Sequence, residues 1–103
     1  MEFCKLEIFI PETHLSQLQA ALQSVDAGHI GDYDSCLSYS HVIGQWRPLK
    51  NARPYSGKQN ELSQEAELKV ELRIKISNLQ KTIQAIKDVH PYKTPVINVI
   101  PLL

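Results

Sequence analysis

The sequence has few of the features on which small secreted proteins and membrane proteins depend. It contains two cysteines among 103 residues, too few for the disulfide framework of small extracellular domains. No apolar run approaches the roughly 20 residues of a membrane-spanning helix, and no charged and then apolar leader opens the chain. We therefore expect a soluble cytoplasmic protein that has no membrane partner.

The chain also lacks net charge. Eleven lysines and arginines balance eleven aspartates and glutamates, so the formal charge at pH 7 is zero. Surfaces that bind nucleic acids through phosphate contacts normally carry a basic excess, which disfavours a nucleic-acid partner. With 43% hydrophobic residues, no internal repeat and no clear linker, the chain is predicted to form a single domain over residues 1–103.

Four segments have the period of β-strands. Residues 2–10 and 65–76 place an apolar row on one side and charged residues on the other, which predicts strands with one buried and one solvated face. Residues 36–46 also alternate, and residues 96–100 form a short apolar strand. The solvated face of the 65–76 strand is expected to carry Glu65, Glu67, Lys69, Glu71, Arg73 and Lys75.

Two segments have the period of amphipathic helices. The first spans about residues 13–26, with Thr13 as the expected N-cap and Gly28 as its end. The second begins at Ser77 or Asn78, one of which is the expected cap, and is stopped by Pro91. The apolar stripes are formed by Leu15, Leu18, Leu22 and Val25 in the first helix and by Leu79, Ile83, Ile86 and Val89 in the second.

The order of these elements predicts the fold class. Strand, helix, strand, strand, helix, strand is the βαββαβ order of a ferredoxin-like α+β sandwich, in which two helices cover one face of an antiparallel four-stranded sheet. A long loop, about residues 47–64, separates the second and third strands and contains two prolines and one glycine but no apolar period. Loops of that length in compact domains are usually functional or disordered.

Four stretches of the sequence resemble a known family. They are residues 11–15 (PETHL), 28–36 (GHIGDYDSC), 44–48 (GQWRP) and 90–95 (HPYKTP). They look like the domain inserted in YqfO-type proteins of the Nif-three-like family, also labelled GTP cyclohydrolase type I-like, and that domain is similar to CutA and the PII signalling proteins. The resemblance implies a stand-alone, ferredoxin-like and typically trimeric protein, with the long loop as a contact loop for effectors or partners.

The same resemblance implies that hydrolase activity is not carried over. In the larger family the dinuclear metal site belongs to flanking domains, outside the inserted domain that this chain resembles. Family members usually place Glu-Glu or Glu-Val after His-Pro-Tyr, whereas this chain has Lys93 and Thr94. The lysine reverses the charge at a position where an acid could support a cation.

Metal-compatible side chains are concentrated in one segment. His29, Asp32, Asp34 and Cys36 lie close together in the sequence, and residues 32, 34 and 36 would share one face of a strand. Together with His90, they are the candidate ligands for a divalent metal. The alternative, which we favour, is a structural turn, because Gly and Asp are typical turn residues. No cofactor is otherwise indicated.

The candidate binding residues are Tyr33, Trp46, Arg47, His90 and Tyr92. A tryptophan beside an arginine can anchor an interface or stack on a planar ligand, although Trp46 could equally fill the edge of the core. His90 and Tyr92 follow the second helix, where they could line a cleft. The alternative for His90, which we favour, is a local interaction with the negative end of that helix.

These observations leave three functional hypotheses. The first is a small, non-enzymatic, oligomeric binding or regulatory protein of CutA/PII-like type, which binds a small ligand, a metal ion or a protein partner at subunit clefts. The second is a metal-assisted hydrolase that uses His29, Asp32, Asp34 or His90. The third is a structural adaptor that makes contact through the Trp46 loop. We predict no catalytic residues, because the sequence contains no nucleophile motif.

Overall fold

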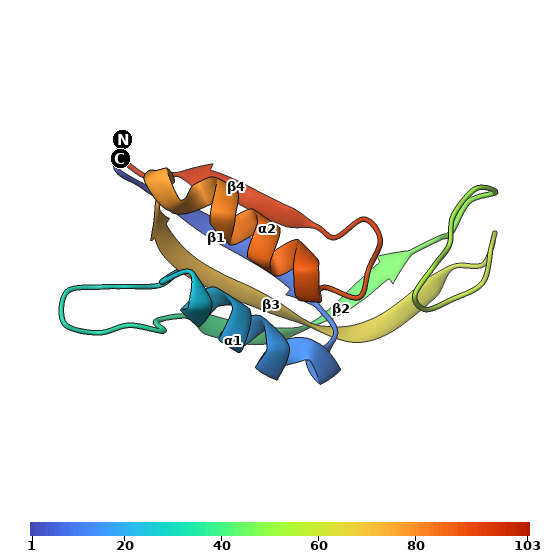
Figure 1. Ribbon diagram of the computed structural model, residues 1–103. Helices are drawn as coiled ribbons and strands as arrows, with labels where there is room; N and C mark the ends of the chain where they lie inside the picture. The colour runs from blue at the N-terminus through green and yellow to red at the C-terminus, as the bar shows by residue number, and fades with distance from the viewer.

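The computed structural model describes all 103 residues as four strands and two helices. In chain order these are β1 (Phe3–Ile10), α1 (Leu15–Ser24), β2 (Ser38–Trp46), β3 (Ser63–Lys75), α2 (Leu79–Val89) and β4 (Ile97–Pro101). The sheet is antiparallel throughout, in the order β2-β3-β1-β4. Both helices lie on the same face of it (Figure 1). This is the predicted ferredoxin-like α+β sandwich. Neither helix has the length and apolarity needed to cross a lipid bilayer.

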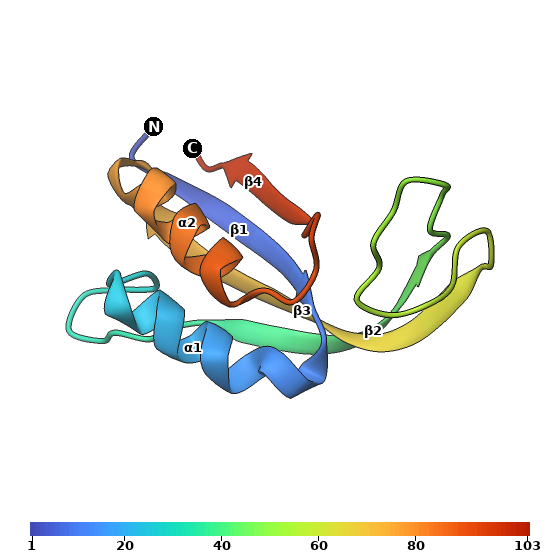
Figure 2. The same cartoon turned by 45° about the vertical axis from the view of Figure 1, so that its right-hand side comes forward.

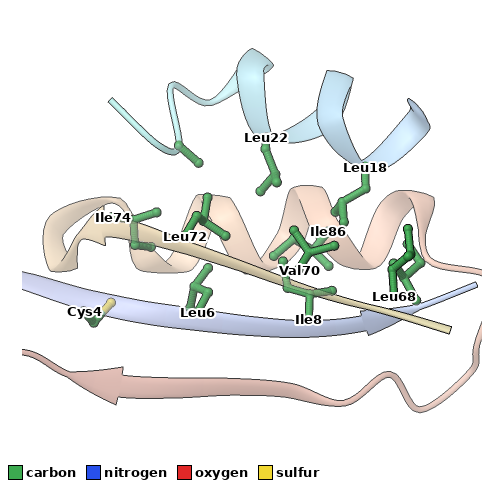
Figure 3. Close-up of a cluster of buried hydrophobic side chains, with 12 residues drawn as sticks. Cys4, Leu6, Ile8, Leu18, Leu22, Leu68, Val70, Leu72, Ile74 and Ile86 are labelled. Atoms are coloured by element: carbon green, nitrogen blue, oxygen red, sulfur yellow. The ribbon is translucent and has the colours of Figure 1, made fainter. Parts of the chain in front are cut away.

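The predicted alternation of β1 and β3 builds the core. Every second residue of β1, and of β3 from Leu68 to Ile74, points toward the helices, and side chains from α1 and α2 pack onto that row (Figure 3). The row begins at Leu68, because Ala66 is exposed. Full burial of one such side chain contributes about 1.5–3 kcal/mol, so this cluster supplies most of the driving force for folding. Its members are Cys4, Leu6, Ile8, Ile10, Leu18, Leu22, Ala27, Leu68, Val70, Leu72, Ile74 and Ile86.

The helix ends differ from the prediction. Neither helix has a side-chain cap, and each follows a short 3-10 turn, Glu12–His14 before α1 and Ile76–Asn78 before α2. The Thr13 hydroxyl hydrogen-bonds to the ring of His14, and the Asn78 amide donates to the carbonyl of Val25. Thr13 was wrong as the N-cap of α1, because His14 occupies that position, whereas Asn78 does occupy the N-cap position of α2. Neither helix has the expected side-chain capping bond, because a tightened first turn engages part of the free backbone polar groups and the side chains have other partners.

The solvated face of the sheet carries a network of ion pairs. Lys69 Nζ lies 3.5 Å from Glu7 Oε2 and 4.0 Å from Glu71 Oε1, and Lys5 pairs with the same two glutamates. Isolated pairs of this kind contribute little to stability. The prediction of a fully solvated charged face was wrong at one position, because Glu67 is only 6% exposed.

The β2 and β3 strands continue beyond the helices as a two-stranded ribbon that carries the long loop at its end (Figure 2). The last pair of that ladder is Trp46 with Ser63, so the loop spans residues 47–62. Internal hydrogen bonds close the loop on itself. The amide of Asn60 donates to the carbonyl of Pro48, and the Gln59 side chain donates to the carbonyls of Lys50 and Ala52.

Candidate functional site: an aromatic groove under the long loop

A groove of about 620 Å³ lies between the long loop and the segment that joins α2 to β4. Figure 2 shows these two segments, in green and in red, facing each other beside the ribbon. The volume lies in the range of small-molecule sites. The residues that carry the argument below are Phe9, Trp46, Tyr55, Glu67 and Tyr92, all of which line the groove.

Three aromatic rings from three different segments meet at this groove. The ring of Tyr92 lies 5.9 Å from that of Trp46 and 5.8 Å from that of Tyr55, measured between centroids. The Trp46 indole N–H donates to the carbonyl of Ser56 over 3.2 Å, which ties the base of the loop to its far limb. The tilted rings pack against one another at these distances and together form an aromatic wall of the groove.

A buried carboxylate lies beside these rings. The hydroxyl of Tyr92 donates to Oε2 of Glu67 over 2.6 Å. On the neighbouring strand, Gly44 leaves open the space that the Glu67 carboxylate occupies, since a β-carbon built there would collide with it. Burial, and then the hydrogen bond to Glu67, raise the pKa of the Tyr92 phenol well above its usual range. The phenol therefore stays protonated and acts as a donor.

His90 holds Tyr92 in position. Its Nε2 donates to the carbonyl of Phe9 over 2.7 Å, and its Nδ1 accepts from the backbone N–H of Tyr92 over 3.1 Å. These two partners require the neutral ring with the proton on Nε2. Burial lowers the pKa of this imidazole, which favours the same form. His90 thus links the end of α2 to β1, which is more than the local helix-end role predicted for it.

The structure brings together three of the five predicted binding residues. Trp46 and Tyr92 line the groove, and His90 lies directly behind Tyr92, with their ring centroids 5.0 Å apart. Arg47 is exposed and does not line the groove. Tyr33 is 74% exposed, in the loop between α1 and β2 at the opposite end of the molecule from the groove (Figure 1).

The predicted metal-ligand segment forms a turn. The ring of His29 is engaged on both sides, by Asp26 Oδ1 and by the Gly31 carbonyl, each 3.0 Å away. Asp26 also raises the pKa of this imidazole. Asp34 accepts from the hydroxyl of Ser35, and the Cys36 thiol points to the Asp34 carbonyl at 3.7 Å. Nowhere in the chain do three His, Cys, Asp or Glu side chains gather as a metal site, so His29, Asp32, Asp34, Cys36 and His90 are not brought together.

Sequence reasoning missed Glu67, Tyr55 and Gly44. Glu67 was concealed by the alternation of β3, in which it occupies a regular charged position. Gly44 did carry a signal, because a glycine inside a strand often marks a close approach by another group. Tyr55 lies in a loop without apolar period, where no local pattern distinguishes a groove residue from an exposed one.

Similar sequences cover nearly all of this chain but only part of their own length. No protein-family model matches the chain. A GTP cyclohydrolase 1 type 2 homolog from Halalkalibacterium halodurans is 37% identical over 98 residues, which are 95% of this chain and 26% of the relative. The homolog of the same name from Bacillus subtilis is 34% identical over 98 residues, again 95% of this chain and 26% of the relative. The chain thus spans about a quarter of the length of these curated relatives.

Solved structures also match nearly the whole of this chain. The Bacillus cereus protein related to NIF3 has a TM-score of 0.86 and 32% identity, covering 98% of this chain and 26% of its own. CutA from Synechococcus elongatus has a TM-score of 0.70 and 21% identity, covering 98% of this chain and 78% of its own. CutA from Archaeoglobus fulgidus has a TM-score of 0.71 and 14% identity, covering 97% of this chain and 83% of its own. The chain is therefore homologous to a segment, about a quarter in length, of the NIF3-related GTP cyclohydrolase 1 type 2 homologs, and it has the fold of the CutA proteins.

Proposed function

We propose that this chain is a small, non-enzymatic binding or regulatory protein of CutA/PII-like type that holds a small organic ligand in the aromatic groove. The observation that carries the proposal is the groove itself, in which the rings of Trp46 and Tyr55 pack against Tyr92 and the Tyr92 hydroxyl holds one buried carboxylate. Apolar walls with a few fixed polar groups are typical of small-molecule sites. The free thiols of Cys4 and Cys36 are in keeping with action in the reducing cytoplasm.

A homotrimer is the proposed assembly, with the groove at a cleft between copies. The helices cover only one face of the sheet, and the opposite face carries as many positive as negative charges in its central network. Both edge strands expose apolar side chains, Ile43 on β2 and Val99 and Ile100 on β4. An edge strand with unpaired backbone groups and exposed apolar side chains is a template for pairing with another chain. Sedimentation velocity that gave only monomers at micromolar concentrations would contradict this assembly.

A small organic ligand is favoured over a metal ion or a hydrolytic reaction. Several solved neighbours are named divalent cation tolerance proteins, and the curated relatives are named after a cyclohydrolase. In this chain, however, the side chains that could bind a metal do not gather in one place. His29 is hydrogen-bonded to Asp26, and Asp34 accepts a hydrogen bond from Ser35. The groove instead presents stacking surfaces and a single carboxylate, which suit an organic molecule.

Native mass spectrometry of gently purified protein tests the proposal. We expect an added mass that corresponds to a small molecule, and we expect Trp46→Ala to lose it. Tyr33→Ala is the matched control, because it removes an exposed aromatic ring at the other end of the molecule. A fragment screen read by the fluorescence of the only tryptophan provides a second measurement if the ligand leaves during purification. The proposal fails if no compound perturbs Trp46 or if both variants retain the same added mass.

A further inference from the structure

We propose that the ligand of the groove presents an organic cation with N–H donors, a guanidinium or a primary ammonium group, to Oε1 of Glu67. This inference rests on the proposed function and specifies the chemistry of the ligand. It follows from the hydrogen bonding of Glu67, its burial and the rings beside it.

The Glu67 carboxylate is buried and incompletely satisfied. The residue is 6% exposed, and its Oε2 has one donor, the Tyr92 hydroxyl, whereas its Oε1 has none. Every fully buried polar side-chain atom in the protein has a partner. The Oε1 atom is therefore not fully buried, and it is the carboxylate atom that lies directly against Gly44. Because Glu67 and Gly44 both line the groove, we infer that the remaining free surface of Oε1 is reached from the groove. Buried carboxylates are normally paired with a cation or with several donors, because desolvation of an isolated charge is costly.

No cation of this chain fills that role. The ion pairs of the protein are those of the solvated sheet face and the pair between His29 and Asp26, and none of them includes Glu67. Arg53 and Lys93 line the groove, but both are solvent-exposed, and neither lies within 4.0 Å of the Glu67 carboxylate. Glu7 shows the contrast, since Lys5, Lys69 and Asn98 all contact its carboxylate.

The position of the carboxylate is fixed before any ligand binds. The Tyr92 hydroxyl holds one oxygen, and the close approach to Gly44 determines where the carboxylate can lie on the ribbon. A fixed acceptor does not have to be ordered during binding, which favours affinity. The rings of Trp46 and Tyr92 line the same groove, where they can stack on a guanidinium group or contact the methylene next to an ammonium group. Aromatic rings attract cations in both kinds of contact.

A pair of probes of the same shape separates charge from shape. Phenylguanidinium and phenylurea are both planar, aromatic N–H donors, but only the first is a cation. We expect phenylguanidinium to quench or shift the Trp46 fluorescence saturably and to bind at least about tenfold more tightly than phenylurea, as a charged hydrogen bond in place of a neutral one predicts. Isothermal titration checks the affinities. This comparison needs only the wild-type protein.

Glu67→Gln tests the assignment to the carboxylate. The variant keeps the shape of the side chain and an acceptor for Tyr92, and it should lower phenylguanidinium affinity at least about tenfold while leaving phenylurea nearly unaffected. Glu61→Gln, which changes an exposed loop glutamate, should bind both probes like the wild type. A thermal melt of each variant verifies folding.

Four outcomes would overturn the inference. Equal binding of the two probes would show recognition by shape alone. Binding that survives Glu67→Gln would place the charge recognition elsewhere. If neither probe binds and Glu67→Gln changes the oligomeric state, the cation comes from a second copy of this chain. Neutral or anionic compounds that perturb Trp46 in the fragment screen would remove this inference but leave the proposed binding function in place.

Discussion

The carboxylate of Glu67 lies against Gly44, in the space that the β-carbon of any other residue at position 44 would fill. The two residues lie on neighbouring strands, where Gly44 pairs with Glu65 and Val42 pairs with Glu67. The close approach gives the carboxylate a buried position that it could not have over an alanine. Tyr92 then completes the arrangement by donating its hydroxyl from the segment after α2.

Gly44→Ala should therefore destabilise the protein and weaken the groove together. The new methyl group forces the Glu67 side chain out of its position, and the overpacking is expected to lower the free energy of unfolding by about 1–3 kcal/mol. Urea denaturation measures the loss, with Ser40→Ala on the same strand as an exposed control. The double variant Gly44→Ala/Glu67→Ala should recover much of the stability. Strictly additive effects of the two changes would contradict a direct clash.

The neutral form of His90 predicts that stability depends on pH. Its pKa in the folded protein is lowered, so the unfolded chain binds more protons when the pH lies between the folded value and the ordinary value near 6.5. The contribution of His90 is thus complete above about 6.5 and is lost as the pH falls toward the folded pKa. Protonation of Nδ1 would also place a donor opposite the N–H of Tyr92.

Free energies of unfolding at pH 8 and pH 5 check this dependence. The decrease on acidification should be smaller in His90→Gln than in the wild type. His29 acts in the opposite direction, because its raised pKa stabilises the fold below about 6.5 and this effect fades as the pH rises through its folded value. His29→Gln should therefore make the decrease on acidification larger. Parallel pH profiles for the wild type and His90→Gln would falsify the role given to His90.

Trp46 should hold the long loop in place through its indole N–H. Trp46→Phe keeps an aromatic ring but removes the hydrogen bond to the Ser56 carbonyl, a loss of about 0.5–1.5 kcal/mol. We expect faster amide exchange within residues 47–62, including the Asn60 amide that donates to Pro48. The core strand β1 should exchange at the wild-type rate. Unchanged exchange in the loop would mean that its internal hydrogen bonds suffice.

Ile86 tests the core. Its side chain is fully buried between α2 and the sheet, so Ile86→Ala should cost about 2–5 kcal/mol of the free energy of unfolding. Lys87→Ala, on the exposed side of the same helix, should change stability by less than about 0.5 kcal/mol. Thermal or urea unfolding distinguishes the two. A small effect of Ile86→Ala would mean that the helices contribute less to the core than their packing indicates.

The fold was predictable because β1, β3 and both helices repeat their apolar residues with a clear period. The position of both helices on one face follows from the rule that the apolar face of the sheet must be covered. The groove was predictable only in part. Trp46 and Tyr92 are conspicuous residue types, but the burial of Glu67 depends on a tyrosine 25 residues away and a glycine on the next strand. The alternation of residues along one strand does not reveal contacts with residues of other segments.

The metal candidates show the converse limit. His29, Asp34 and Cys36 are close in sequence, and residue type alone makes them plausible ligands. The backbone between them turns too sharply to gather their side chains, as the paired bridge between Ile30 and Tyr33 shows. Gly31, at a φ of 57°, lies inside this bridge, and Gly28, at a φ of 88°, allows the backbone of Cys36 to approach closely.

The two hydrogen bonds of His90 anchor one wall of the groove to the body of the protein, whereas the other wall belongs to the projecting ribbon and loop. Tyr92 is joined through His90 to β1 and to the end of α2, and through its hydroxyl to Glu67 of β3. Trp46 and Tyr55 belong instead to the ribbon and loop that project past the helices (Figure 2). The hydrogen bond from Tyr92 to Glu67 and the packing of Tyr92 against Trp46 and Tyr55 therefore join the two parts of the protein across the groove. A change in any of these side chains would alter the attachment of the loop as well as the lining of the groove.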